Sequence, residues 1–147
     1  MTRFPIVAAV LAGALLLSAC VSSSKVAVTH SMMTRLSGFS EVPPVSGAAT
    51  GSAETSYNVD TRVLQWSVTY SSLSGPATGG HFHGPAMPGV NAPVALAFSG
   101  SLASPITGNA VLTPAQSADL LAGRWYVNLH TAANPGGEIR GQVVVGN

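Results

Sequence analysis

The chemistry in this sequence is concentrated in a short stretch, residues 79–86, where histidines lie between glycines. Two of the four histidines in the chain, His81 and His83, are two residues apart there. In an extended strand alternate side chains leave on the same face, so His81 and His83 point one way and Phe82 the other. The Cα atoms of alternate residues on a strand are about 6.6 Å apart, and two imidazoles at this spacing can lean inward so that each nitrogen lies about 2.0–2.1 Å from one ion. The spacing predicts part of a metal site.

A third histidine, His130, occurs far along the chain in a second strand-like segment, residues 125–131. If the fold places this segment beside the first, three imidazoles converge on one point. Such a ligand set suits copper or zinc, and the affinity order among divalent ions favours copper over zinc. The fourth ligand is left open between water, methionine and a carboxylate. Four polar residues near His130 are candidates for holding the ligands in place: Tyr126, Asn128, Glu138 and Arg140.

Other interpretations of these residues stay open. His81 and His83 can serve only as strand residues that hydrogen-bond neighbouring backbone, while Gly79, Gly80 and Gly84 can serve tight turns. The four polar candidates can equally be exposed strand residues. Under these interpretations the chain is a protein-interaction module without a metal.

An enzyme activity is not favoured by the sequence. The five acidic residues form no evident carboxylate pair. No Ser-His-Asp order or phosphate-binding glycine loop stands in its proper context. Oxidase or dismutase chemistry therefore ranks behind both metal binding and protein interaction.

The N-terminus has the pattern of an export signal. Arg3 is followed by an apolar run at 4–17, too short to span a bilayer comfortably, and by small residues before Cys20. This arrangement resembles the bacterial lipobox, in which Cys20 becomes the lipidated first residue. We expect a signal peptide at 1–19, a lipidated tether at 20–33 and a β domain at 34–147. His30 is expected to be a solvated tether residue.

Export and lipidation limit the chemistry that remains. Cys20 is the only cysteine, so neither an internal disulfide nor a thiolate metal site is available. Removing the signal leaves five basic and five acidic residues, and no basic run exists to neutralise nucleic-acid phosphates. The expected partners are a membrane, reached through the lipid anchor, and a protein. The expected location is the periplasm and outer membrane or the cell surface.

Short alternating segments separated by glycine and proline predict an all-β fold with one short helix. The strongest period-2 alternation runs through residues 64–70. Thr113 and Pro114 have the form of a helix start, and Gly123 supplies its stop. Residues 125–131 and 138–145 are expected to pair as a hairpin. The expected core of a sandwich or barrel comes from three segments: Leu64, Trp66, Val68, Leu96, Phe98, Trp125, Val127 and Leu129.

Several phrases, in order, resemble the CHRD domain, which is named after repeats in chordin and also occurs singly in bacterial exported proteins. The phrases lie at residues 36–44, 81–86, 112–116, 121–131 and 134–142. The resemblance covers about residues 33–145 and implies an immunoglobulin-like or superoxide-dismutase-like β fold. It implies no defined activity. The chain lacks the additional histidine and aspartate ligands of copper, zinc superoxide dismutases, so a dinuclear site of that kind is not expected.

Overall fold

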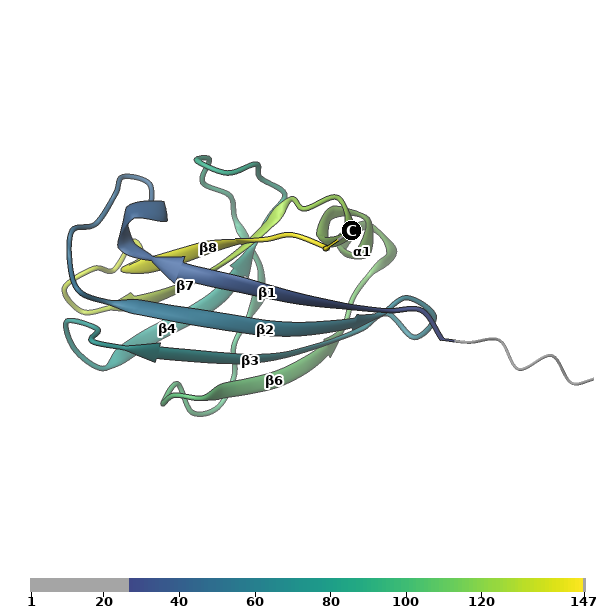
Figure 1. Ribbon diagram of the computed structural model, residues 1–147, viewed down its shortest axis with the longest axis horizontal. Coiled ribbons are helices and arrows are strands. Elements are labelled where there is room, and N and C mark those ends of the chain that lie inside the picture. Colours follow the sequence, from purple (N-terminus) through teal and green to yellow (C-terminus); the bar gives the residue numbers. More distant parts are fainter. Residues whose placement is uncertain (1–26, 147) are drawn as a thin grey trace, which may run out of the picture.

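The computed structural model describes residues 27–146, and their fold is all-β. Eight strands form a single sheet in the order β5-β4-β7-β8-β1-β2-β3-β6, with every neighbouring pair antiparallel. Figure 1 shows this sheet curling so that β4 and β7 lie behind β1, β2 and β3. The expected all-β sandwich or barrel with one short α-helix is confirmed. The elements are β1 (Thr29–Ser37), η1 (Gly38–Ser40), β2 (Thr50–Asn58), β3 (Val63–Ser71), β4 (Ala77–His83), β5 (Val94–Ala97), β6 (Ile106–Val111), α1 (Pro114–Leu121), β7 (Trp125–Thr131) and β8 (Ile139–Val143).

Aromatic contacts show how far the sheet curls. Trp66 of β3 lies 5.6 Å from Phe82 of β4, centroid to centroid, although four strands separate β3 from β4 in the sheet order. Phe82 in turn lies 5.8 Å from Trp125. The two halves of one sheet therefore face each other across a common apolar core, which replaces the second sheet of a sandwich.

The core contains most of the residues that the alternation predicted. Six of the eight are buried, whereas Leu96 and Phe98 are only partly buried and pack against the edge of the core. This departure follows from the position of β5, which is a four-residue edge strand. Large core residues outside the expected set are Leu36, Tyr57, Phe82, Ile106, Leu120 and Ile139.

The helix begins as its sequence predicts. Thr113 accepts a hydrogen bond from the backbone N–H of Gln116, and the Gln116 side chain accepts one from the Thr113 backbone, which completes a capping box with Pro114 at the first helical position. The chain leaves the helix through Gly123, whose φ of +68° is a left-handed conformation that favours glycine. Along residues 27–146 no helix has the length and apolarity needed to cross a membrane.

The N-terminal end of the domain differs from the expected boundary at residue 34. β1 begins at Thr29 and pairs with β2 along its whole length, so residues 29–33 of the expected tether form part of the sheet. His30 lies in this strand, opposite Tyr57. The expected signal peptide and Cys20 lie outside the described residues.

Candidate metal centre

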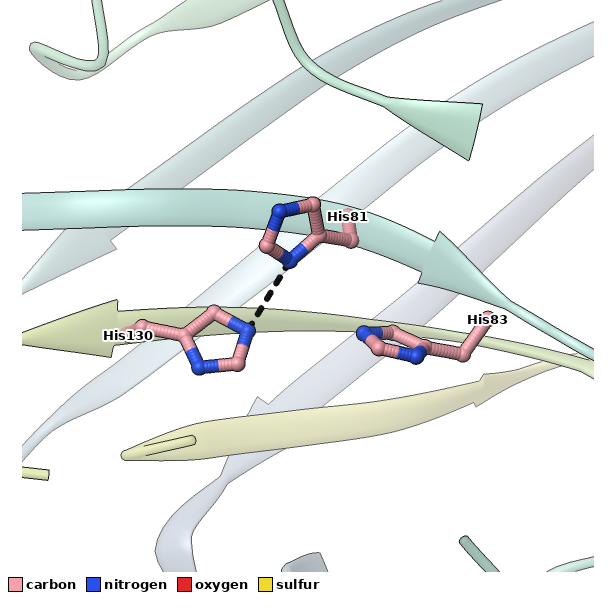
Figure 2. A group of neighbouring side chains, drawn as sticks. All are labelled: His81, His83 and His130. Carbon is pink, nitrogen blue, oxygen red and sulfur yellow. Dashed lines mark hydrogen bonds between the residues drawn. The ribbon is translucent and has the colours of Figure 1, made fainter. Parts of the chain in front are cut away.

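The three expected ligands come together on neighbouring strands. β4 pairs with β7 in a register that sets Gly79 opposite His130, His81 opposite Asn128 and His83 opposite Tyr126. The histidines therefore leave from one face, while Phe82 points into the core with no exposed surface. Figure 2 shows the three imidazoles turned toward one another. The predicted sharing of a face is confirmed.

The ring nitrogens lie near the spacing that a single ion requires. His81 Nδ1 lies 3.0 Å from His130 Nε2, and one ligand nitrogen from each of the three histidines falls within 4.8 Å of the others. Two ligands held 2.0–2.1 Å from one ion are separated by about 2.9 Å at a right angle and about 4.1 Å when opposite. A small side-chain movement would close the widest separation to this range.

Backbone carbonyls fix the tautomers of two of the rings. His83 Nδ1 lies 2.9 Å from the Ala92 carbonyl oxygen, and His130 Nδ1 lies 2.9 Å from that of Pro135. Because a carbonyl oxygen can only accept, each Nδ1 carries the proton in the neutral ring and each Nε2 has the lone pair. The lone pair of His130 Nε2 accepts a hydrogen bond from His81 Nδ1, which an ion between the two rings would replace. Metal-bound histidines are commonly oriented in this way by a hydrogen bond at the other ring nitrogen.

His83 Nε2 is the atom that best indicates a ligand. It is fully buried and has no hydrogen-bond partner among residues 27–146. A buried lone pair without a donor is costly, and such atoms in native structures call for an explanation. An ion among the three imidazoles would satisfy this nitrogen.

The site favours neutral, ligating imidazoles. Burial lowers the pKa of His81 below 6.5, and the proximity of His130 and His83 lowers it further. Burial is also the largest effect on His83, whose pKa is lowered despite the opposing hydrogen bond to Ala92. At neutral pH both rings therefore retain the lone pairs that a metal requires.

The glycines of β4 are explained by close packing, and the interpretation of Gly79 and Gly80 as turn residues is wrong. A Cβ on Gly79 would lie 3.2 Å from the His81 ring and 3.5 Å from that of His130. On Gly80 it would lie 2.5 Å from the Phe98 ring. The glycines thus let the imidazoles and the core approach the strand backbone.

Three of the four polar candidates surround the histidines as buried residues. Asn128 and Tyr126 share the ligand face of β7, and Arg140 lies opposite Asn128 on β8. Each is 2% exposed, so their interpretation as exposed strand residues is wrong. Tyr126 stacks on His83, with ring centroids 4.8 Å apart and planes inclined by 3°.

The fourth candidate, Glu138, is buried but bonds elsewhere. Its carboxylate accepts hydrogen bonds from the Ser74 backbone at 2.7 Å and from the hydroxyls of Ser74 and Thr131 at 2.6 Å. Burial raises its pKa, but these hydrogen bonds outweigh burial and lower it overall. No hydrogen bond joins Glu138 to any of the three histidines in the described part of the chain. Glu138 fastens the loop after β3 to the β7–β8 hairpin.

The loop at residues 84–93 covers the part of this face around His83, Tyr126 and Asn128, whereas His81 and His130 are half-buried. Arg140 donates to Asn91 Oδ1 at 2.8 Å and to the Val90 carbonyl. Gln142 donates to the Ala86 carbonyl at 2.9 Å. The same loop carries Ala92, whose carbonyl orients His83. The loop is thus fixed to β8 on one side and to His83 on the other.

Comparison with known proteins identifies the family of this chain. Residues 32–143 match the CHRD domain. The chain belongs to the CHRD domain family. No curated protein and no solved structure matched the chain.

The CHRD match includes all three clustered histidines and leaves out two residues of interest. It begins after His30, which lies outside the histidine cluster, and Cys20 also precedes it. The histidine cluster is therefore a feature of the CHRD domain of this protein. The family description itself assigns it no activity.

The CHRD domain contains one buried ionisable residue near the histidines that the sequence analysis did not single out. Glu41 lies between η1 and β2 and is 4% exposed, and its Oε1 has no hydrogen-bond partner among the described residues. Burial raises the pKa of Glu41 to about 7, although the charge of Arg140 and contact with the Asn128 amide both lower it. Its only signal in the sequence was a lone acidic residue between Phe39 and a proline pair.

Proposed function

We propose that this CHRD domain holds a single metal ion, copper in preference to zinc, through His81, His83 and His130. The observation that carries the proposal is the buried, unpartnered Nε2 of His83 beside two other imidazoles. Neutral imidazole suits copper and zinc, and the affinity order among divalent ions places copper first. The cluster includes no carboxylate or thiolate, so it presents an uncharged donor set.

A role in metal trafficking, storage or sensing agrees with this donor set. The expected lipoprotein signal, with Cys20 as the lipidated residue, would keep the domain at a membrane outside the cytoplasm. There, in the periplasm and outer membrane or at the cell surface, the domain would meet ions arriving from outside. Catalysis by an oxidase or dismutase route has less support, because the cluster holds three imidazoles and lacks the further histidine and aspartate ligands of copper, zinc superoxide dismutases.

The first test measures metal content and metal-dependent stability. The protein purified without chelators should contain close to one equivalent of copper, and copper added to metal-free protein should raise the melting temperature by about 10 °C at a hundredfold excess over the Kd. His81→Ala, His83→Ala and His130→Ala should each abolish most of this shift. His30→Ala is the matched control and should leave it unchanged.

Two results would reject the metal proposal. One is a lack of binding by copper in either oxidation state and by zinc. The other is an undiminished shift in all three site variants. Either result would favour the protein-interaction module as the function.

One observation favours that alternative. Phe39 is 76% exposed and lines a pocket of about 390 Å³ together with Val42, Pro44 and Pro88. An exposed aromatic ring beside prolines is a feature of protein-binding surfaces. Phe39→Ala should leave metal binding intact, so a co-purifying protein lost from this variant alone would identify the pocket as a binding surface.

Lipid anchoring is tested separately from metal binding. Cys20→Ser should release the protein from the membrane fraction without changing the melting temperature, because Cys20 precedes the folded domain. A wild-type protein with an unmodified N-terminus, or a variant that still sediments with membranes, would contradict the anchor.

A further inference from the structure

Asn128 occupies a central position among the three histidines. It lies directly opposite His81 across β4 and β7, and two residues before His130 on the same face of β7. Its side chain is 2% exposed, so the amide is enclosed beside the buried ring of His83. The Asn128 amide is also close enough to His83 to influence the pKa of that ring.

Two buried acceptor atoms in this region lack donors. Asn128 Oδ1 and His83 Nε2 are both fully buried and both without a hydrogen-bond partner in the described part of the chain. His83 Nε2 carries a lone pair because Nδ1 donates to Ala92. An amide oxygen and an imidazole lone pair cannot satisfy each other, since both are acceptors. A cation between them satisfies both at once.

The Asn128 amide and the Glu41 carboxyl group meet beside Gly137. A Cβ built on Gly137 would lie 2.5 Å from Glu41 Oε1 and 2.8 Å from Asn128 Nδ2, so both side chains line the space over this glycine. Contact with the Asn128 amide lowers the pKa of Glu41, which places the amide nitrogen toward the carboxyl group. Gly137 has a φ of +130° and leaves the space they need. With Nδ2 turned to the carboxyl group, Oδ1 faces the other way.

We propose that Asn128 Oδ1 is the fourth donor of the metal site and that Glu41 is the positioning residue that turns this oxygen toward the ion. The inference rests on the proposed function and extends it. Four protein donors fill the four strong positions of the tetragonal coordination that copper(II) prefers. The site is therefore built to hold an ion and to keep small exogenous ligands out of those strong positions.

Azide is a suitable probe because it gives an intense charge-transfer absorption band when it takes one of the four strong positions of copper(II). The full-length protein loaded with copper(II) should show no azide band and an unchanged electron paramagnetic resonance spectrum. Asn128→Ala should develop the band and should bind copper about 10–100-fold more weakly, the usual cost of losing a group that supports a metal site. Asn128→Asp is the matched control, because it keeps an oxygen at the same position and should show no band.

The outcomes separate this inference from the metal site itself. Copper that binds to the wild type and gives an azide band as strong as that of Asn128→Ala would overturn the fourth donor and leave the three-histidine site in place. If neither protein gives a band, the copper affinities of the wild type and Asn128→Ala are compared. Equal affinities would also overturn Asn128 as the fourth donor. Absence of copper binding by the wild type would overturn both proposals. If Asn128→Ala fails to fold, the azide titration of the copper-loaded wild type still tests the inference, because an azide band in the wild type would contradict it.

Discussion

The guanidinium of Arg140 lies over the ring of Tyr126, with its central carbon 3.3 Å from the ring centroid. Tyr126 stacks on His83, and its hydroxyl accepts a hydrogen bond from the backbone N–H of Ala92. Arg140 also donates hydrogen bonds to Asn91 and Val90 in the covering loop. One buried cation thus joins β8, the loop and the aromatic ring that supports a candidate ligand.

Arg140→Ala should therefore lower both stability and metal affinity. Losing a cation–π contact and hydrogen bonds from a charged donor should cost about 3 kcal/mol or more in the free energy of unfolding. Copper affinity should fall as well, because the loop that carries Ala92 would lose its attachment. Urea unfolding and competitive copper titration measure the two effects.

Arg124→Ala provides the comparison for Arg140. Arg124 pairs at 2.5 Å with Asp119 on the surface, where the two side chains are 44% and 21% exposed. Such a pair contributes less than about 1 kcal/mol. Equal losses for the two arginines would contradict the structural role assigned to Arg140.

The parts of the site that could be predicted from the sequence are those governed by strand periodicity. The shared face of His81 and His83 follows from the two-residue repeat alone. The position of His130 required only that residues 125–131 form a strand beside the first. Local capping rules likewise determined the start of α1.

Other parts had no signal of this kind. The orienting groups at Ala92 and Pro135 are backbone carbonyls, and their positions depend on loop conformation rather than side-chain type. Burial of Asn128 and Arg140 depends on a loop rich in proline and glycine folding back over the sheet, where its composition indicates only a turn. Glu41 reaches Asn128 from a segment without regular structure.

Glu41 should make stability decrease as the pH rises. Its pKa is about 7 in the folded protein against 4.5 for the ordinary side chain, because burial disfavours the charged form. The stability gained from holding the proton is fully present below pH 4.5 and is lost as the pH rises through about 7. In metal-free protein, Glu41→Gln should match the wild type near pH 4.5 and exceed it at pH 8 by up to about 3 kcal/mol.

Urea unfolding of both proteins across this pH range is the measurement. Glu54→Gln is a suitable control, because Glu54 is exposed on β2. A difference between Glu41→Gln and the wild type that stays constant with pH would contradict burial of an ionisable carboxyl at this position.

His81 and His83 should make stability decrease as the pH falls, which is the opposite of the effect of Glu41. Burial and neighbouring imidazoles lower the pKa of His81, and burial lowers that of His83, so both bind protons less readily in the folded protein than in the unfolded one. Their contribution to stability is present above pH 6.5 and is lost as the pH falls from 6.5 toward their folded pKa values. Protons compete with copper for the same lone pairs, so copper should be released as the pH falls below 6.5. A metal-free protein whose stability does not decrease as the pH falls below 6.5 would contradict the lowered pKa values.

Val127 tests which face of β7 belongs to the core. Its side chain has no exposed surface and lies opposite Phe82. Val127→Ala should lower the free energy of unfolding by about 1–3 kcal/mol without changing copper affinity, because it deletes buried methyl groups on the face away from the histidines. Val111→Ala, at a valine that is 67% exposed on β6, should change neither quantity appreciably. Weaker copper binding in Val127→Ala would show that the two faces are not independent.

The place of β8 in the sheet bears on when the domain can fold during synthesis. β8 follows every other described strand along the chain, yet it joins the group β5-β4-β7 to the group β1-β2-β3-β6. Until residue 143 has emerged, these two groups have no strand between them, and the chain must wait for its last segment before the sheet is continuous. Such dependence on sequence-distant pairing slows folding. Completion of the sheet is therefore a late event in the synthesis of this chain.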